Sequence, residues 1–416
     1  MAAHSRVPNV TISMRAASRL RSGHPWVFRS DLPGAGKNKQ QETPRAALVH
    51  VKDERGRMLG SALSSSSSQI ALRLVSDKLL VDDAALVALV RERIEKACAY
   101  RCEIVKNATA YRIAFSEADG LPGLIADRYN DVLTVQFLTQ AMDRKDLRDV
   151  VLDALQQEFA GKKKSSLNIV ERVDAHIRGL EELPAIESRV LSGEKTHTQF
   201  QINGLEFQFD ALAGQKTGAF LDQRENYAAA ERWAKGRALD MFSYQGGFAL
   251  HLARKCDNVT AVDQSRAALE VGEQNERLNQ KKLFCKEIEW IEGNAFDWLK
   301  EQSSASEDHA AQKYDTIVLD PPAFAKSKRN LETAIRGYKE INLRALKMLR
   351  HGGVLVTCSC SQAVSEADFT EMLASAAADA KRSVRIVEKR GAALDHPSIA
   401  TIPETNYLKC LICTVA

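Results

Sequence analysis

Two stretches of the chain decide its fold, Thr316-Ile-Val-Leu-Asp320-Pro-Pro322 and Val354-Leu-Val-Thr-Cys-Ser-Cys-Ser361. Each is an apolar run that stops at polar or rigid residues, which is typical of a buried strand. Two similar runs, Ala238-Leu-Asp240 and Val259-Thr-Ala-Val-Asp263, precede them, with helical segments between. Strands that alternate with helices predict a mostly parallel sheet covered on both faces, so the expected fold class is α/β. Ligands of such sheets bind beyond the carboxyl ends of the strands, where these runs stop.

A loop with two adjacent glycines follows the first of these strands and includes Phe242, Ser243, Gly246 and Gly247. Glycine lets the backbone turn sharply and approach a ligand closely. The loop lacks the G-x-G-x-x-G spacing that places a pyrophosphate on a helix N-terminus. A ligand without phosphate, S-adenosylmethionine, is therefore favoured over NAD or FAD, with Asp240 at the strand end beside it.

The remaining cofactor contacts are expected at the ends of the next two strands. Asp263 is placed for its carboxylate to accept hydrogen bonds from both ribose hydroxyls. The alternative is that Asp263 caps the helix that begins near Ser265. Asn294 and Ala295, which follow the apolar segment 288–291, are expected at the edge of the adenine.

Two prolines follow the acid at the end of the strand that closes with Asp320. Pro321 and Pro322 cannot donate backbone hydrogen bonds and they fix φ, so the acid and the nearby carbonyls are held facing the ligand. This arrangement suits recognition of the flat edge of a base. The alternative is a strand that simply ends in a rigid turn.

A thiol near this acid predicts a particular reaction. Carbon 5 of cytosine is a poor nucleophile, and addition of a thiolate to carbon 6 forms an enamine that can attack a sulfonium methyl group. Asp320 could stabilise the adduct by protonating or hydrogen-bonding ring nitrogen 3. Cys358 and Cys360 are two positions apart, so spacing does not decide which one attacks, and both could instead be packing residues. The sequence does not identify the base that removes the ring proton.

Composition and length bound the class of protein. The 416 residues exceed what one hydrophobic core usually serves and predict two or three domains. A net charge of +4 is only a mild bias, so any RNA contact must come from local basic clusters. Eight scattered cysteines fit a reducing compartment, and Cys410-Leu-Ile-Cys413 fits a closing strand better than a zinc site, so we expect no metal. Without a long apolar run or a secretory signal, we expect a cytoplasmic protein without membrane contact.

The chain before the parallel sheet falls into two further parts. Residues 1–80 have the pattern of short strands and turns, with Ser64 to Ser68 as a loop inside this β-rich module rather than a linker. Residues 81–190 mix strands with helices, and a polar stretch after Leu191 marks a boundary. The expected domains are therefore 1–80, 81–190 and 191–416.

These residues resemble the RlmI family of large-subunit ribosomal RNA cytosine-C5 methyltransferases, and the resemblance runs nearly end to end. The matching segments are His24-Pro-Trp-Val-Phe28, Glu117-Ala-Asp-Gly-Leu-Pro-Gly123, Lys216-Thr-Gly-Ala-Phe-Leu-Asp-Gln-Arg224, Phe242-Ser-Tyr-Gln-Gly-Gly-Phe248, Asp320-Pro-Pro-Ala-Phe324, Arg336-Gly-Tyr-Lys339 and Ser359-Cys-Ser361. The resemblance implies a PUA domain, a small central α+β domain and a Rossmann-like class I methyltransferase domain that uses S-adenosylmethionine. It also implies methylation of carbon 5 of a cytosine in large-subunit (23S) ribosomal RNA.

The resemblance assigns roles to individual residues. The Ser-Cys-Ser motif gives the nucleophile to Cys360, with Asp320 as its catalytic partner. The segment that holds Lys216, Gln223 and Arg224 is expected to close over the cofactor, with Gln223 and Arg224 near its amino-acid end. Pro321 is also expected at the cofactor.

One departure concerns the wider group of RNA cytosine methyltransferases. Relatives with two catalytic cysteines carry one directly after the proline of the acid motif, and here Ala323 stands at that position. Single-cysteine relatives complete the reaction, so the proton acceptor stays open.

RNA is expected to contact basic side chains through its phosphate backbone. The candidates are Arg29, within the stretch 15–29, and Lys326, Lys328, Arg329 and Arg336. Access to a base edge requires an unstacked nucleotide, so a flexible or single-stranded region of rRNA is the expected target.

Two other functions stay open from the sequence. The enzyme could methylate an exocyclic amine of a guanine, with Asp320 orienting the amine and Cys360 only structural. The chain could instead be a non-catalytic RNA-binding ribosome assembly factor, although the intact Asp240, Asp263, Asp320 and Cys360 argue against it. The target nucleotide and the oligomeric state, including a homodimer, are not given by the sequence.

Overall fold

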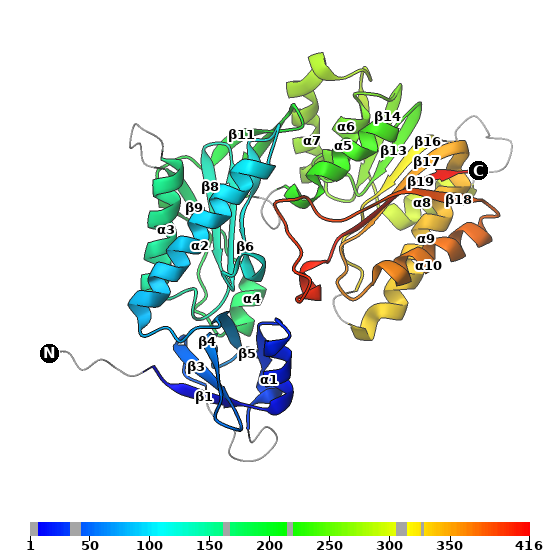
Figure 1. Cartoon of the computed structure of the whole chain (residues 1–416). Helices are drawn as coiled ribbons and strands as arrows, with labels where there is room; N and C mark the ends of the chain where they lie inside the picture. The colour runs from blue at the N-terminus through cyan, green and yellow to red at the C-terminus, as the bar shows by residue number, and fades with distance from the viewer. Residues whose placement is uncertain (1–6, 34–42, 161–166, 214–218, 305–313, 326–327) are drawn as a thin grey trace. The chain divides into compact units, whose positions relative to one another are not determined.

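The computed structural model describes residues 7–33, 43–160, 167–213, 219–304, 314–325 and 328–416 (Figure 1). Internal contacts divide the chain into two units, each assembled from separate pieces of the sequence. The first unit comprises Met1–Thr198, Phe209–Gly218 and Asp395–Thr405, and the second comprises Gln199–Gln208, Ala219–Leu394 and Asn406–Ala416. The three domain ranges expected from the sequence stay a prediction.

The first unit begins with a five-stranded sheet in the order β1-β3-β4-β5-β2. Its elements are β1 (Asn9–Ile12), α1 (Met14–Arg21), β2 (Trp26–Phe28), β3 (Leu48–Asp53), β4 (Met58–Ser64) and β5 (Ile70–Ser76). The Ser13 hydroxyl caps α1 by accepting a hydrogen bond from the amide of Ala16. The serine tract connects β4 to β5, which pair in antiparallel fashion, so it is a loop inside the module as expected.

A second five-stranded sheet of this unit has the order β10-β9-β8-β7-β6. Its strands are β6 (Ala110–Phe115), β7 (Leu124–Tyr129), β8 (Val132–Phe137), β9 (Asn168–Glu171) and β10 (Arg189–Ser192), and its helices are α2 (Asp83–Ile104), α3 (Lys145–Phe159) and α4 (Ala175–Leu180). Helix α2 packs against α3 and β6. Apolar residues of both helices and of the sheet form one core, which confirms the mixture of strands and helices expected over this range.

A late segment, Asp395–Thr405, belongs to the first unit although it follows β18 in the sequence. Its Asp395 carbonyl accepts a hydrogen bond of 2.8 Å from the fully buried guanidinium of Arg101. The Asp395 carboxylate accepts another, also 2.8 Å, from the backbone amide of Arg112. The segment therefore supplies buried polar contacts that this unit would otherwise lack.

Residues 197–210 form a two-stranded hairpin. It consists of β11 (His197–Ile202) and β12 (Leu205–Asp210). Asn203 and Gly204, which form the turn, have φ values of +53° and +82°. Positive φ at both central residues is what a two-residue hairpin turn requires, and Asn-Gly is its preferred sequence.

The second unit contains a seven-stranded sheet in the order β15-β14-β13-β16-β17-β19-β18. Its strands are β13 (Arg237–Met241), β14 (Asn258–Asp263), β15 (Ile288–Glu292), β16 (Tyr314–Leu319), β17 (Leu349–Ser359), β18 (Val384–Arg390) and β19 (Lys409–Val415). The first five are parallel, and β19 runs antiparallel to both β17 and β18. The mostly parallel sheet predicted from the sequence is confirmed.

Helices cover both faces of this sheet. They are α5 (Arg224–Trp233), α6 (Gly247–Leu252), α7 (Arg266–Asn279), α8 (Ala295–Ser304), α9 (Leu331–Met348) and α10 (Glu366–Asp379). Figure 1 shows α5, α6 and α7 on one face and α8, α9 and α10 on the other. Successive strands are added on one side of β13 up to β15 and on the other side from β16 onward. Ligands bind beyond the carboxyl ends of the two strands at this switch point, β13 and β16, in this architecture. Among the helices of the described residues, none is both long and apolar enough to cross a membrane.

Candidate active site

Four of the residues singled out from the sequence lie at one edge of the seven-stranded sheet. Asp240 is near the end of β13, Asp263 ends β14, Asp320 directly follows β16, and Cys360 directly follows β17. These strands are parallel neighbours, so their carboxyl ends meet at the same edge. The sheet therefore brings together the acids and the thiol.

Asp240 is a buried carboxylate that organises the loop after β13. Its Oδ2 accepts hydrogen bonds from the Ser243 hydroxyl (2.7 Å) and from the amide of Ala249 (2.9 Å). Its Oδ1 is buried and has no hydrogen-bond partner among the described residues. Burial raises the pKa of Asp240 from 3.8 to about 7, and the hydrogen bond from Ser243 opposes this rise. A positively charged ligand group at this carboxylate would favour its ionised form.

The loop between β13 and α6 is held in an uncommon conformation. Phe242 and Tyr244 have φ values of +64° and +52°, which residues other than glycine rarely adopt. The amide of Tyr244 donates a 2.9 Å hydrogen bond to Oδ2 of Asp263, and the amide of Ser243 donates to the carbonyl of Val262. Backbone strain of this kind concentrates at ligand sites because surrounding contacts must maintain it.

The two glycines of the loop are required by packing. Gly246 has φ +84°, and a Cβ there would lie 2.6 Å from the Trp290 ring. A Cβ at Gly247 would lie 2.5 Å from the hydroxyl of Tyr227. The sequence suggested that these glycines allow a ligand to approach, whereas the space beside each Cα is occupied by an aromatic side chain of the chain itself.

The residues expected at the ribose and the adenine also have structural partners. Asp263 accepts from the amide of Ser265 at 2.8 Å, while Ser265 itself caps α7, so Asp263 supports the turn before the helix. Oδ1 of Asn294 accepts from the amide of Phe296 at the start of α8, and Ala295 is buried. Their roles toward a ligand stay predictions.

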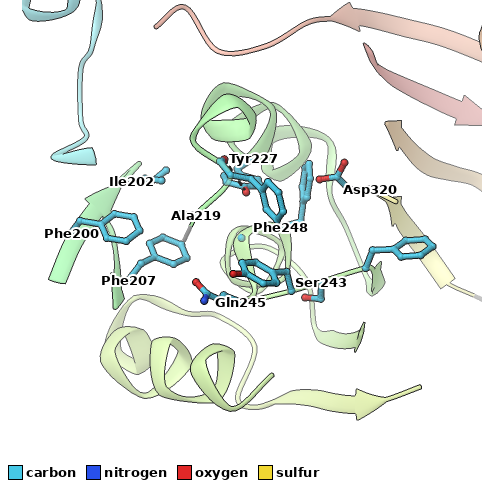
Figure 2. Close-up of a pocket in the computed structure, with 13 residues that line it drawn as sticks. Phe200, Ile202, Phe207, Ala219, Tyr227, Ser243, Gln245, Phe248 and Asp320 are labelled. Atoms are coloured by element: carbon cyan, nitrogen blue, oxygen red, sulfur yellow. Dashed lines mark hydrogen bonds between the residues drawn. The ribbon is translucent and has the colours of Figure 1, made fainter. Parts of the chain in front are cut away.

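An aromatic pocket adjoins the glycine loop. Its lining residues are Phe200, Ile202, Phe207, Ala219, Phe220, Tyr227, Phe242, Ser243, Tyr244, Gln245, Gly247, Phe248 and Asp320. Figure 2 shows Phe200 and Phe207 on one side and Asp320 on the other, with Tyr227 and Phe248 between them. Tyr227 and Phe248 meet edge to face, with ring centroids 4.7 Å apart. Aromatic faces attract a cation, so the pocket is suited to an organic cation with apolar groups.

The hairpin side of this pocket was missed in the sequence. Phe200 and Phe207 come from β11 and β12, in which buried residues alternate strictly with exposed residues (β11) or partly buried ones (β12). That alternation, with Asn203-Gly204 between the two runs, is the standard signal of a hairpin and could have identified it.

A chain of hydrogen bonds holds Asp320. Nε2 of Gln223 donates to Oδ1 of Asp320 at 2.9 Å. Oε1 of Gln223 in turn accepts from Asn226 at 2.7 Å, and Oδ1 of Asn226 accepts from Arg390 at 2.9 Å. Gln223 and Asn226 are both buried. Gln223 was expected near the cofactor, and the structure shows that its amide contacts the acid.

The two cysteines of the Ser-Cys-Ser region have different environments. Cys358 is fully buried in β17, opposite Cys410 of β19, and burial raises its pKa well above the ordinary value. Cys360 lies just past the strand and is partly exposed. Its Sγ is 3.8 Å from the carbonyl oxygen of Pro321, the residue after Asp320. Of the two thiols, Cys360 is the one next to the acid motif and accessible to a ligand.

Ser361, the residue after Cys360, is hydrogen-bonded to the segment that follows the Asp-Pro-Pro motif. The hydroxyl of Ser361 accepts from the amide of Ala325 at 3.2 Å and lies 2.9 Å from the hydroxyl of Tyr338. Tyr338 is fully buried in α9. Lys409, the first residue of β19, donates to the Ser361 carbonyl at 2.7 Å and was not identified from the sequence.

The remaining candidates are dispersed. Arg224 is buried, and its guanidinium forms an ion pair of 2.7 Å with Glu225. Arg29 donates hydrogen bonds to the carbonyls of Ser65 and Ser68, so it supports the serine loop. Arg329 and Arg336 are exposed; Arg329 lies in the 3-10 turn Lys328–Asn330 before α9, and Arg336 lies within α9. Lys216 and Lys326 lie outside the described residues, and the side chain of Lys328 is likewise not described.

No metal site is apparent among the described residues, where no group of three or more His, Cys, Asp or Glu side chains could hold an ion. Cys410 and Cys413, which the sequence assigned to packing, are both buried in β19.

Comparisons with known proteins identify the class of this chain. Residues 121–412 match the family model of S-adenosylmethionine-dependent methyltransferases, and residues 10–77 match a PUA-like domain. A solved structure described as a methyltransferase in complex with S-adenosylhomocysteine has the same fold, with a TM-score of 0.80, 19% identity and coverage of 98% of this chain and 100% of that one. A methyltransferase from Streptococcus mutans gives a TM-score of 0.79 at 19% identity, with the same coverage. The chain is thus a class I methyltransferase with an N-terminal PUA-like domain.

Curated relatives narrow the class. Ribosomal RNA large subunit methyltransferase I of Shewanella denitrificans is 36% identical over 403 residues, which are 95% of this chain and 96% of the relative. The protein of the same name from Serratia proteamaculans is 34% identical over 407 residues, covering 96% and 97%. This chain belongs to the ribosomal RNA large subunit methyltransferase I family, and its methyl donor is S-adenosylmethionine.

The residues at the sheet edge fit this donor. S-adenosylmethionine carries a sulfonium and an ammonium group, and a cation near the unpaired Oδ1 of Asp240 would satisfy a buried acceptor. The aromatic pocket between the hairpin and Asp320 suits a sulfonium with its alkyl groups.

Proposed function

We propose that this protein methylates carbon 5 of a cytosine in large-subunit ribosomal RNA through a transient bond between Cys360 and the ring. The observation that carries the proposal is the placement of Cys360, whose partly exposed Sγ lies 3.8 Å from the carbonyl of Pro321. Nucleophile and acid motif thus follow adjacent parallel strands, β17 and β16.

Each residue has a distinct task in this reaction. Cys360 adds as a thiolate to carbon 6, which makes carbon 5 nucleophilic. Asp320, held in place by Gln223, protonates or hydrogen-bonds ring nitrogen 3 and so stabilises the electron pair displaced from the ring. S-adenosylmethionine, when bound, supplies the methyl group. A base then removes the proton from carbon 5, the bond between carbon 6 and Sγ breaks, and the electron pair returns to Cys360 as thiolate.

The cofactor contacts expected from the sequence support this arrangement. Asp240, Asp263 and the loop between them lie at the same edge as Asp320. Gln223, Arg224, Pro321, Asn294 and Ala295 belong to segments that approach this edge, and their contacts with the donor are part of the proposal. Arg29, Lys326, Lys328, Arg329 and Arg336 are proposed to contact phosphates. A cytoplasmic location fits a substrate that is part of the ribosome.

The rival reaction is methylation of an exocyclic amine of guanine. Amine methylation needs no thiol beside the acid, and in that case Cys360 would have no covalent role. A non-catalytic assembly factor is a weaker alternative for two reasons. The relatives of the chain are named as ribosomal RNA methyltransferases, and Asp240, Asp320 and Cys360 are all present at the sheet edge.

Two measurements test the proposal. After incubation of the purified protein with large-subunit RNA and S-adenosylmethionine, digestion to nucleosides and mass analysis should yield 5-methylcytidine, whereas a methylated guanosine would refute the thiol mechanism. RNA that contains 5-fluorocytidine cannot lose its substituent from carbon 5, so it should leave a stable conjugate on Cys360. Failure of the wild-type protein to form this conjugate while it still methylates normal RNA would reject the covalent step.

A further inference from the structure

Lys409 is placed against the peptide that follows Cys360. It is the first residue of β19, and its Cα is paired with that of Ser359, the last residue of β17. Its Nζ donates hydrogen bonds to the carbonyls of Ser361 (2.7 Å) and Tyr407 (2.8 Å). Strand pairing therefore fixes the backbone of Lys409, and the hydrogen bond to the carbonyl of Ser361, the residue after Cys360, fixes the end of its side chain.

This ammonium is buried without a carboxylate. Lys409 is only 6% exposed, and no described acidic side chain forms an ion pair with it. Two carbonyls satisfy two of its three N–H groups. A buried charge is costly unless a charge of opposite sign lies nearby. Burial lowers the pKa of Lys409 to about 8, and the electrostatic interaction with Cys360 is the influence that raises it.

Several other ionisable groups lie around Cys360. Asp320 precedes the Pro321 carbonyl that Sγ approaches, and an ionised carboxylate there opposes a thiolate. Tyr338, in α9, is held on Ser361 and interacts electrostatically with Cys360. Cys358 is buried in the same strand. Lys409 is the cation among these groups, and its charge interacts electrostatically with Cys360.

We propose that Lys409 is a positioning residue whose ammonium stabilises the thiolate of Cys360, so that the nucleophile is ionised near neutral pH. The thiol proton leaves to solvent, to which Cys360 is partly exposed, and Lys409 keeps its own proton. A cation beside a cysteine lowers the pKa of the thiol and increases the fraction of reactive thiolate. The inference deepens the proposed function, because the thiolate is the species that would add to the cytosine ring.

The competing role for Lys409 is that of the base that removes the proton from carbon 5. That role requires a neutral amine with a free lone pair, and a neutral amine could donate to the same two carbonyls through its two N–H groups, so experiment must separate the two roles. The two roles predict opposite effects of removing the amine. Loss of a thiolate stabiliser slows formation of the adduct, and loss of the base lets a methylated adduct accumulate.

The direct test follows alkylation of Cys360 by iodoacetamide between pH 5.5 and 10 in the full-length protein, with each cysteine peptide quantified by mass spectrometry. Cys102 is exposed and serves as a reference thiol within the same molecule. In the wild type, the pH midpoint of Cys360 should lie below that of Cys102. In Lys409→Met the Cys360 midpoint should rise, so that its alkylation near pH 7 slows about tenfold while the limiting rate at high pH is kept.

Two further variants separate charge from structure. Lys409→Arg keeps a cation and should restore a low midpoint. Tyr338→Phe removes a hydroxyl that contacts Ser361 but no charge, and should leave the midpoint unchanged. An unchanged Cys360 midpoint in Lys409→Met would overturn the inference. If Lys409→Met does not fold, equal midpoints for Cys360 and Cys102 in the wild type would overturn it as well.

The RNA reaction gives an independent readout. With RNA that contains 5-fluorocytidine, Lys409→Met should form the conjugate about tenfold more slowly at pH 7 than the wild type. Accumulation of a methylated adduct on ordinary RNA in this variant would assign the role of base to Lys409 and reject the present inference. Absence of any conjugate in the wild type, with the alkylation shift intact, would instead reject only the proposed covalent reaction.

Discussion

The side-chain amide of Gln223 donates a hydrogen bond of 2.9 Å to Oδ1 of Asp320, and Asn226 holds the other end of that amide. The side-chain orientation of Asp320 is therefore fixed before a nucleobase binds. Such preorganisation matters because a small misplacement of a reacting group can cost a large part of the rate.

Replacement of Gln223 with leucine should affect catalysis more than donor binding. Gln223→Leu is similar in volume but cannot donate to Asp320, so we expect kcat to fall by about 10–100-fold, and loss of the proposed donor contact to raise the KM for S-adenosylmethionine by a smaller factor. Steady-state transfer of tritiated methyl groups into RNA measures both constants. An unchanged kcat would show that Asp320 does not depend on this hydrogen bond.

The two cysteines of β17 and its end provide a matched pair. Cys360→Ala should abolish turnover and the 5-fluorocytidine conjugate, because the nucleophile is lost. Cys358→Ala removes a buried sulfur, so it should lower the free energy of unfolding by about 1 kcal/mol and keep most of the activity. Urea unfolding and methyl transfer test the pair. The assignment of the nucleophile is wrong if Cys358→Ala loses turnover while Cys360→Ala retains it.

Asp240 should make cofactor binding depend on pH. Its pKa in the folded chain is about 7, above the ordinary 3.8, so its ionisation opposes folding: the stabilisation is complete below pH 3.8 and is lost as pH rises through 7. A cationic donor at this carboxylate favours the ionised form, so its binding near pH 6.5 should release protons. Calorimetric heats of binding should then vary with the ionisation enthalpy of the buffer. Asp240→Asn should remove that variation, and buffer-independent heats in the wild type would contradict the contact.

Two glycines with nearly the same φ separate strain from overlap. Gly204 (φ +82°) has open space around its missing Cβ, whereas at Gly246 (φ +84°) a Cβ would lie 2.6 Å from Trp290. We expect Gly204→Ala to lower the free energy of unfolding by about 1 kcal/mol, from backbone strain alone. Gly246→Ala should cost about 2–4 kcal/mol, because Trp290 must also move. Equal urea midpoints for the two variants would show that the Trp290 contact is easily relieved.

Arg336 is exposed on α9, with a long ion pair of 3.9 Å to Glu332 and a long hydrogen bond of 3.5 Å to the Thr333 hydroxyl. If it contacts a phosphate, Arg336→Ala should weaken RNA binding to a similar extent for different RNA sequences and reduce the slope of log affinity against log salt concentration by about 1. Filter binding at several salt concentrations measures this slope. Arg336→Lys keeps the charge and should retain it, and an unchanged slope in the alanine variant would place the RNA elsewhere.

Much of the second unit could be predicted because strand ends carry their own signals. The runs that end at Asp240, Asp263 and Asp320 are apolar and bounded by helical segments, and parallel pairing then brings their ends together. The hairpin with Asn203-Gly204 had an equally clear signal that was not used. Local sequence therefore predicted where each segment is, even when its partner was unknown.

Three features depended on tertiary contacts and could not be predicted from local pattern; the family resemblance alone favoured Cys360 over Cys358. The choice between Cys358 and Cys360 rests on where β17 ends, and strand ends are poorly defined by local pattern. Lys409 reaches the carbonyl of Ser361, the residue after Cys360, because β19 pairs antiparallel with β17. Position 246 requires glycine because the ring of Trp290, a residue of β15, occupies the space where a Cβ would lie. Each depends on neighbours distant in the sequence.

The position of Asp395–Thr405 has a consequence for how the protein is made. During translation, Arg101 is synthesised 294 residues before its partner Asp395. Neither unit has all its pieces until the chain beyond residue 394 has been synthesised, since β19 follows that segment. A nascent chain that stops before residue 395 therefore lacks a buried contact in one unit and, in the other, the strand β19 that pairs with both β17 and β18, and we expect it to be a substrate for proteases rather than a working fragment.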